Sequence, residues 1–171
     1  DGELLRVASQ TAENLHSICP YRFIAKASPA RAAVLAQQSL ALADLVKACQ
    51  TRQNSFLIVE GAGGFLSPIA RDGLNADLII KLKLPVVLVA ADILGTINHI
   101  LLNLEAMSAR KVDCHAIVLN QLRRENNPAL DNAEELRHYT QLPIISLPYC
   151  DSSAWQVLTA HLDYLSGLLL N

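Results

Sequence analysis

The sequence of 171 residues has few charged and aromatic side chains, and this scarcity excludes several classes of protein. Lysine and arginine total 14 against 16 acidic residues, so the chain lacks the positive charge that attracts nucleic acid or anionic lipid. Aromatic residues make up 5%, too few for a base-stacking surface. No apolar run approaches the ~20 residues of a membrane-spanning helix. We therefore expect no nucleic-acid partner and no membrane partner.

Patterns for disulfides, metal clusters and targeting are also missing. The four cysteines, at positions 19, 49, 114 and 150, form no CxxC pair, and the five histidines form no HExxH motif. This spacing predicts free thiols in a reducing cytoplasm and no zinc site. The first residues have neither the basic start nor the apolar core of a signal peptide. Because the chain begins with Asp1 instead of methionine, we expect processing or truncation.

Four short apolar runs rich in β-branched residues predict strands at 56–59, 86–89, 116–119 and 144–147. The runs are continuous, as expected for parallel strands with both faces covered. Helical patterns lie between and around them. One runs from 29 to 50 with Pro29 in its first turn after Ser28, and its apolar stripe comprises Leu35, Leu42, Leu45, Val46 and Cys49.

Three more helices are predicted after the second strand. The first has an apolar stripe between Ile97 and Met107, the second opens with a capping box of Asp131 and Glu134, and the third is marked by leucines from Leu158 to Leu169. Alternating strands and helices predict one α/β domain over residues 1–171, with a parallel sheet between two helical layers. The mainly helical first 50 residues would then cover a sheet whose first strands are missing.

The first predicted strand ends in Glu60, and three glycines follow within four residues, at 61–64. Glycines let a backbone approach a ligand closely, and their N–H groups can point at phosphate oxygens. A carboxylate just before them suits Mg²⁺, which takes few protein ligands. The alternative is a tight turn before Pro68 with a solvated Glu60. The residues alone leave both interpretations open.

The second strand is followed by a helix that begins near Gly95 or Thr96. Open parallel sheets bind ligands beyond the carboxyl ends of their strands, and the free N–H groups of a helix start favour an anion. The alternative is an ordinary N-cap at Thr96. We expect His99, further along this helix, to be a packing or surface residue.

The last two strands also end in polar or ring-bearing residues. Asn120 and Gln121 follow the third strand, and a side-chain amide suits the edge of a purine because it both donates and accepts. Pro148 and Tyr149 follow the fourth strand, where a ring could flank a base. An ordinary polar loop and a strand-terminating turn are the alternatives.

A common triphosphate motif is absent from these 171 residues. The phosphate loop GxxxxGK[ST] needs a lysine after a glycine. The lysines stand at 26, 47, 81, 83 and 111, and none follows a glycine. The dinucleotide fingerprint GxGxxG and a serine nucleophile motif are missing too.

Five segments occur in a characteristic order, namely VEGAGG at 59–64, LPVVLV at 84–89, LGTINH at 94–99, VLN at 118–120 and LPY at 147–149. Together they resemble the ATP-dependent dethiobiotin synthetases. Upstream, Asp1, PYRF at 20–23 and SP at 28–29 fit the same family. The resemblance covers essentially the whole chain. Its specific signal is EGAGG together with LGxINH at this separation, since either motif alone is weak.

The resemblance implies a P-loop NTPase-like fold and a homodimeric ligase of biotin biosynthesis. Such enzymes close the ureido ring of dethiobiotin from 7,8-diaminononanoate, CO₂ and ATP with Mg²⁺. By position, it implies Asp1 and Glu60 as Mg²⁺ and nucleotide ligands, and Gly61, Ala62 and Gly63 as backbone beside ATP and substrate. No residue of this chain is assigned a catalytic role.

The resemblance also implies two binding segments later in the chain. The helix start at Gly95, Thr96, Ile97 and Asn98 would receive the substrate carboxylate across the dimer interface. Asn120, with Gln121, would contact adenine, and Pro148, Tyr149 and Cys150 would form a loop beside the base.

In the family pattern, a strand, a GxxxxGKT-like loop, a helix and a second strand with a catalytic lysine precede the position of Asp1. We expect these to be missing from the chain, so that this fragment alone does not turn over. One alternative is a non-catalytic dimerisation or binding paralogue of the same fold. Another is a related P-loop amidoligase or partitioning ATPase.

Overall fold

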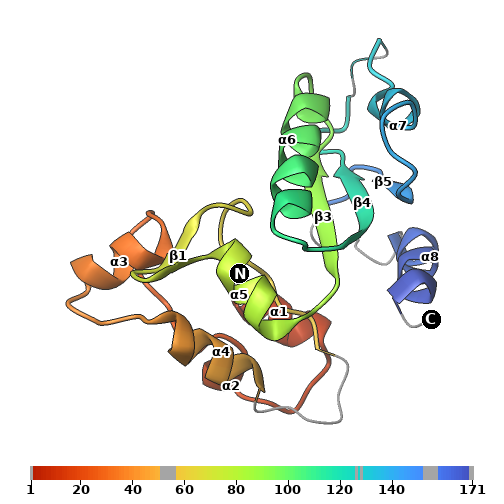
Figure 1. Cartoon of the computed structure of the whole chain (residues 1–171). Coiled ribbons are helices and arrows are strands. Elements are labelled where there is room, and N and C mark those ends of the chain that lie inside the picture. The colour runs from red at the N-terminus through yellow and green to blue at the C-terminus, as the bar shows by residue number, and fades with distance from the viewer. Residues whose placement is uncertain (1, 51–56, 126, 128, 152–157, 170–171) are drawn as a thin grey trace. The chain divides into compact units, whose positions relative to one another are not determined.

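The computed structural model describes residues 2–50, 57–125, 127, 129–151 and 158–169 (Figure 1). Its backbone contacts divide the chain into two compact units, Asp1–Lys83 and Leu84–Asn171. The first unit has one described cluster of buried apolar side chains, and the second unit has two. The single domain expected over the whole chain stays a prediction.

The second unit contains a parallel sheet of β3 (Val86–Ala91), β4 (Cys114–Asn120) and β5 (Ile144–Leu147), in the order β3-β4-β5. Three of the four predicted strands are therefore confirmed, and β5 has the predicted bounds. The carboxyl ends are in register, because Asn120 pairs with Ala91 on one side and with Leu147 on the other.

Helices cover both faces of this sheet, which confirms the expected α/β layering. The helices are α6 (Thr96–Ala109), α7 (Asn132–Leu136) and α8 (Thr159–Leu169). One core cluster joins the sheet to α6 and α7, and its buried members are Ile100, Ile117, Leu119 and Leu136. The cluster on the other face comprises Ala116, Val118 and Ile145, with Leu165 of α8 packed against them. Side chains along β4 alternate between these clusters, as the period of a strand requires.

The first unit is mainly helical, as expected. It comprises α1 (Gly2–Ala8), α2 (Leu15–Ile18), α3 (Pro29–Leu35), α4 (Leu42–Gln50), β1 (Pro68–Ala70), β2 (Gly73–Leu74) and α5 (Asn75–Leu82). Strands β1 and β2 pair as a short antiparallel hairpin. The core of this unit contains Ala33, Leu40, Leu42, Ile69, Ala70 and Leu78.

The predicted helix from 29 to 50 is wrong as a single element. Helix α3 ends at Leu35, and Gln37 takes a left-handed φ of 55°. The carbonyl of Leu40 then accepts a hydrogen bond from the Arg71 N–H at 3.2 Å, so this backbone bonds outside any helix. The predicted apolar stripe is not buried along its whole length, because Leu35 is 54% exposed whereas Leu42 is buried.

The predicted strand at 56–59 is not observed. Residue 56 lies outside the described residues, and residues 57–59 form no strand. The side chain of Ile58 is 77% exposed. An apolar run becomes a strand only where a neighbour completes its hydrogen bonds, and the described part of this unit pairs no strand with residues 57–59.

Helix starts agree better with the sequence. Pro29 lies in the first turn of α3 after the N-cap Ser28, although the serine hydroxyl makes no capping bond. The Asp131 side chain accepts a hydrogen bond from the Glu134 N–H at 3.1 Å and caps α7.

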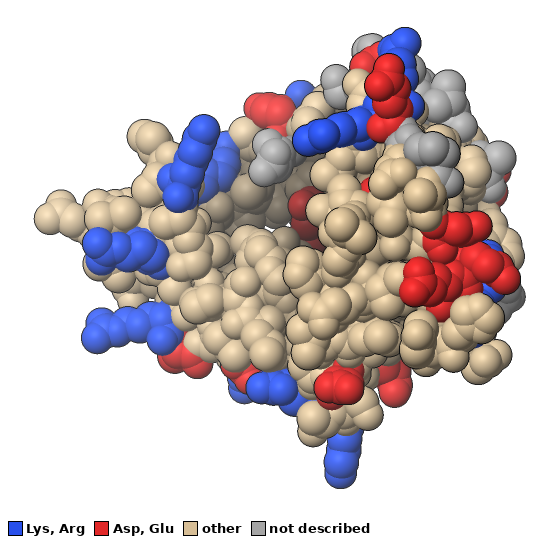
Figure 2. All heavy atoms as spheres, turned by 90° about the horizontal axis from the view of Figure 1, so that it is seen from above, with Lys and Arg blue, Asp and Glu red and all other residues tan. Residues whose placement is uncertain are grey.

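On the face seen in Figure 2, side chains of both charges stand among larger uncharged areas. No helix in the described part of the chain is long and apolar enough to cross a bilayer.

Candidate functional site

The glycine-rich segment after Glu60 folds as a compact loop in the first unit. The Ser67 N–H donates to the Gly64 carbonyl, and the Gly64 N–H donates to Ser67 Oγ, both at 2.9 Å. Gly63 has a φ of 81°, a conformation that favours glycine. The loop is therefore the tight turn that one interpretation predicted. A turn of this kind still leaves room for a ligand, because backbone N–H groups remain unused.

Three consecutive N–H groups in this loop have no acceptor among the described residues, and they belong to Gly61, Ala62 and Gly63. All three residues are exposed. Backbone N–H groups that face solvent from a glycine-rich loop can bind phosphate or carboxylate oxygens. The loop thus offers three free backbone donors, and the binding of an anion there stays a prediction.

Glu60, directly before the glycines, is exposed and pairs with no described residue. Its carboxylate is free to act as one Mg²⁺ ligand, since Mg²⁺ keeps several waters and binds phosphates for the rest. Among the described residues there is no cluster of three or more His, Cys, Asp or Glu side chains. The donor set therefore fits an ion that arrives with a nucleotide better than a caged structural metal. Asp1, the other expected ligand, lies outside the described residues.

The start of α6 provides a second group of free N–H donors, in the second unit. Gly95 is the N-cap with a φ of 91°, and Thr96 is buried behind it. The first backbone bond into the helix runs from His99 N–H to the Gly95 carbonyl at 3.3 Å. The N–H groups of Ile97 and Asn98 have no acceptor among the residues that the structure describes.

This helix start follows the end of β3, where an anion would meet free donors and the positive end of a 14-residue helix. The N-cap is Gly95, so the alternative of a Thr96 cap is wrong. An added Cβ at Gly95 would meet nothing within 4 Å, so lack of space does not explain the glycine. The positive φ does, because glycine adopts it without strain. His99 is exposed, as expected of a surface residue.

The structure places Asn120 and Gln121, two of the predicted base-contacting residues, against the end of β5. The Gln121 N–H donates to the Leu147 carbonyl at 3.0 Å, and Asn120 pairs with Leu147 in the sheet. Pro148, Tyr149 and Cys150 continue directly from β5. Residues expected on the evidence of two separate sequence segments are therefore neighbours.

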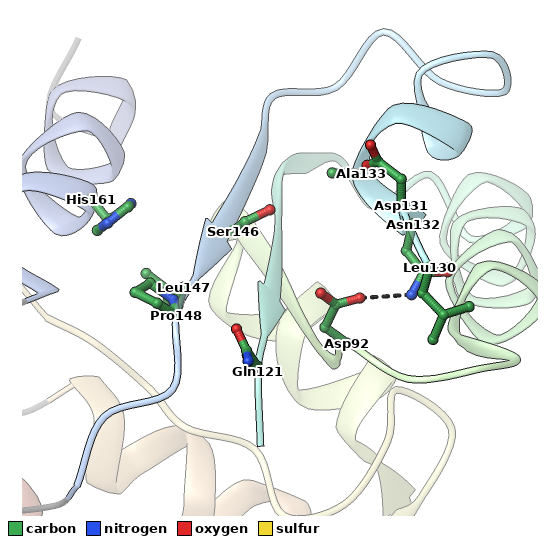
Figure 3. A pocket seen from close by; sticks show the side chains of 10 residues that line it. All are labelled: Asp92, Gln121, Leu130, Asp131, Asn132, Ala133, Ser146, Leu147, Pro148 and His161. Carbon is green, nitrogen blue, oxygen red and sulfur yellow. Dashed lines mark hydrogen bonds between the residues drawn. The ribbon is translucent and has the colours of Figure 1, made fainter. Parts of the chain in front are cut away.

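A cavity of about 380 Å³ opens at this edge of the sheet (Figure 3). Gln121 and Pro148 line it, as do Asp92, Asn132 and His161. The described residues of its lining include two carboxylates and no lysine or arginine, so they suit an uncharged group with N–H donors better than a phosphate. Asn120, Tyr149 and Cys150 are not part of this lining.

Neither Asp92 nor Asn132 was predicted as a site residue from the sequence. The Asn132 Nδ2 donates to Asp92 Oδ1 at 2.6 Å and to the Ile93 carbonyl at 3.3 Å, which ties α7 to the end of β3 (Figure 3). Asn132 is only 5% exposed. Asp92 directly follows β3, but the predicted strand ended at residue 89, so the rule that singled out Glu60 did not reach it. No local signal marks Asn132.

Two charged partners of Tyr149, Arg124 and Asp151, were also not predicted. The Tyr149 hydroxyl donates to Asp151 Oδ1 at 2.8 Å, and Arg124 forms an ion pair with Asp151 at 3.1 Å. The Arg124 guanidinium lies 6.0 Å from the centre of the Tyr149 ring. The hydrogen bond to the Asp151 carboxylate, and then its negative charge, raise the pKa of Tyr149. The cluster holds the ring in a defined position after β5.

The four cysteines are free thiols in the described structure. The expected absence of a zinc site stays a prediction. Burial raises the pKa of the Cys114 thiol and of the Cys49 thiol, so both resist ionisation. A thiol held in its neutral form is a poor nucleophile.

The chain is similar to several known proteins. A family model described as an AAA domain matches residues 1–157. The ATP-dependent dethiobiotin synthetase BioD of Anaeromyxobacter dehalogenans (strain 2CP-1 / ATCC BAA-258) is 40% identical over 153 residues, which cover 87% of this chain and 69% of the relative. The protein of that name from Phenylobacterium zucineum (strain HLK1) is 37% identical over 162 residues, with 90% and 69% covered.

A third relative, from Vesicomyosocius okutanii subsp. Calyptogena okutanii (strain HA), has the same name and is 40% identical over 145 residues, with 85% of this chain and 65% of the relative covered. The AAA-domain match, together with the parallel sheet between helical layers, confirms the P-loop NTPase-like α/β class expected from the sequence.

Proposed function

Because the chain belongs to the family of ATP-dependent dethiobiotin synthetases, we propose that its protein closes the ureido ring of dethiobiotin in biotin biosynthesis. Family membership confirms the resemblance drawn from the sequence, and it assigns the chain to ATP-dependent ligases. The structural observation that carries the proposal is the pair of unpartnered N–H groups, at Ile97 and Asn98, where α6 begins beyond a parallel strand.

The proposed reaction begins when one amine of 7,8-diaminononanoate takes up CO₂ as a carbamate. A carbamate oxygen attacks the γ-phosphorus of ATP, which releases ADP and gives a carbamic–phosphoric anhydride. The second amine then attacks the carbonyl carbon and expels phosphate, and the loss of its proton completes the ring. Such chemistry depends mainly on placing the reactants and on neutralising the transferred phosphoryl group.

We assign the loop at 60–64 to the nucleotide and the metal. Glu60 would supply one carboxylate ligand to Mg²⁺, with Asp1 as the second. Mg²⁺, when bound, would offset the charge of the phosphates. The free N–H groups of Gly61, Ala62 and Gly63 would donate to ATP or to the carbamate. Support for this comes from the exposure of Glu60 and from the three unused donors beside it.

We assign the start of α6 to the carboxylate of the substrate. The free N–H groups of Ile97 and Asn98 and the helix dipole favour a negative group there, with Gly95 and Thr96 shaping the turn. Following the family resemblance, we propose a homodimer in which this carboxylate belongs to a substrate held by the other subunit. An aliphatic acid suits the site, because Leu94 beside it is 82% exposed and apolar.

We assign the edge beyond β4 and β5 to adenine. Gln121 and Pro148 line the cavity, while Asn120, Tyr149 and Cys150 flank it along the chain. The lining is rich in acceptors, which suits the exocyclic amine of adenine. The four free cysteines support a reducing compartment, and we propose the cytoplasm.

The test uses the protein expressed from its complete reading frame. It is incubated with 7,8-diaminononanoate, bicarbonate and Mg·ATP, and dethiobiotin is measured by mass spectrometry. We expect product that depends on ATP. No dethiobiotin from folded protein would overturn the proposal, and binding of the diamine without turnover would favour the non-catalytic paralogue. The 171 residues contain no GxxxxGK[ST], so we expect these residues alone to form no product.

A matched pair of variants tests the role of Glu60. Glu60→Gln keeps the size of the side chain but removes its charge, and we expect kcat/KM to fall about 10- to 100-fold, as for other changes around a metal. Glu105→Gln is the control, since Glu105 is also exposed and lies on α6 away from the helix start. Equal activity of the two variants would exclude Glu60 as a ligand.

A further inference from the structure

Asn75 is a buried polar residue that contacts the glycine-rich loop from outside the motif. It is the first residue of α5 and is 4% exposed. Its Nδ2 donates to the carbonyls of Ala62 and Gly64, both at 2.9 Å, and a longer contact of 3.5 Å reaches the Ser67 carbonyl. The carbonyls of Ala62 and Gly64 therefore both point toward the same side-chain amide.

The orientation of this amide is specified by its surroundings. Asn75 Oδ1 is buried and has no hydrogen-bond partner among the described residues. Rotating the amide by half a turn would place this oxygen against the carbonyls and bring acceptors together. Retaining a buried oxygen without a partner is unfavourable, so the two hydrogen bonds made by the nitrogen must outweigh it.

The bond from Asn75 to the Ala62 carbonyl also decides where the Gly63 N–H points. No described peptide bond is cis, and in a trans peptide the C=O and N–H bonds point in opposite directions. Because the Ala62 carbonyl points at Asn75, the Gly63 N–H points away from it. That N–H has no acceptor among the described residues and lies in the exposed part of the loop.

Asn75 further restricts the residue at position 61. A Cβ added to Gly61 would lie 2.9 Å from Asn75 Oδ1 and 3.3 Å from its Cγ. The Asn75 side chain therefore occupies the space beside Gly61 and keeps this part of the loop bare. Backbone without side chains is what a close approach to a ligand requires.

From these contacts we infer that Asn75 is a positioning residue, which turns the carbonyls of the glycine loop inward so that the Gly63 N–H faces the bound anion. The inference rests on the proposed function of the loop. Asn75 itself does not touch the ligand, since its nitrogen is engaged with the backbone and the residue is buried.

The first test replaces Asn75 with aspartate, which has the same shape but at neutral pH presents an oxygen to the Ala62 and Gly64 carbonyls. We expect kcat/KM for dethiobiotin formation to fall at least about 10-fold, measured well below the melting temperature of each variant. The defect relative to the unmodified protein should shrink as the pH falls from about 8 to about 6, because burial favours a protonated carboxyl, which can donate one hydrogen bond. A residue that only stabilises the fold would not produce this pH profile.

The control is Asn103→Asp. Asn103 also donates through Nδ2 to a backbone carbonyl, that of His99 at 2.7 Å, but it lies in the middle of α6. If Asn75→Asp does not fold, Asn75→Ser replaces it. A serine hydroxyl can donate to one of the two carbonyls, so we expect an intermediate loss of activity. Asn75 variants that keep kcat and KM within twofold would overturn the inference.

A second measurement separates this inference from the proposed reaction. The backbone amide resonance of Gly63 is followed by NMR while Mg·ADP or 7,8-diaminononanoate is added. We expect it to shift in the unmodified protein and to respond at least 10-fold more weakly in Asn75→Asp. If this result is found but no dethiobiotin forms, the reaction is wrong and the positioning role stands. A Gly63 resonance that does not respond in the unmodified protein, or responds equally in both, would overturn the role of Asn75.

Discussion

Replacing Gly63 with alanine tests how closely the glycine loop is specified. Gly63 has a φ of 81°, and a residue with a side chain costs roughly 1–2 kcal/mol in this left-handed region. The new Cβ would lie 2.7 Å from Ser67 Oγ and 3.0 Å from Ser67 Cβ. The hydroxyl must therefore turn away and lose the hydrogen bond that it accepts from the Gly64 N–H, which contributes about 1 kcal/mol.

The two effects predict that Gly63→Ala lowers the free energy of unfolding by about 2–3 kcal/mol. Ser67→Ala removes only the hydrogen bond and should cost about 1 kcal/mol. In the double variant no hydroxyl remains to be displaced, so the combined cost should stay near 2–3 kcal/mol, with a coupling of about 1 kcal/mol between the sites.

Denaturant unfolding followed by circular dichroism measures these differences. Gly64→Ala is the matched control, because its φ is not positive and an added Cβ would meet only Ser67 Oγ, at 3.8 Å. We expect this control to change the free energy of unfolding by less than about 1 kcal/mol in either direction. If Gly63→Ala were no worse than Gly64→Ala, or if the Gly63 and Ser67 changes were additive, the left-handed angle and the Ser67 hydrogen bond would not be what specifies the loop.

Three further predictions concern the second unit. Asn98→Pro removes one free N–H within the first turn of α6, where proline is tolerated. KM for the diamine should therefore rise at least about 10-fold relative to Asn98→Ala. A diamine that lacks the carboxylate should have the same KM with both variants. Leu136→Ala leaves a cavity at a fully buried position and should lower the free energy of unfolding by about 2–5 kcal/mol. The control Leu102→Ala changes a side chain that is 55% exposed and should lower it far less. Equal losses of stability in denaturant unfolding would contradict the described core. The Tyr149 phenol should ionise above the ordinary tyrosine pKa, so the stability from its bond to Asp151 is present below about pH 10 and lost as the pH rises through the raised value. Asp151→Asn should move the tyrosinate absorbance transition to lower pH, and no movement would rule out the bond.

Much of the sheet could be predicted from the sequence because burial on both faces leaves a local mark. The apolar run at 144–147 coincides with β5, and the run at 116–119 lies within β4. The break after Leu35 could not be predicted in this way. It depends on a left-handed Gln37 and on a bond between Leu40 and the distant Arg71, and neither leaves a periodic pattern in the sequence.

The candidate site shows the same division between local and distant causes. Glycines after an acid, and a glycine before a helix, are visible in the sequence because each meets a local backbone requirement at Gly63 or Gly95. The side chains that support these segments are separated from them along the chain. Asn75 reaches back 13 residues to Ala62, and Asn132 reaches back 40 residues to Asp92. Such partners become known only when the fold is known.

The glycine loop has a thermodynamic consequence for ligand binding. Its bend is fixed by Ser67 and Asn75 through hydrogen bonds made wholly within the protein. Ordering a flexible backbone costs roughly 1–2 kcal/mol per residue, and here folding has already met that cost before any ligand arrives. A preorganised loop of this kind should bind its ligand with little loss of protein conformational entropy. Its glycines can therefore expose the backbone to the ligand although the loop itself stays ordered.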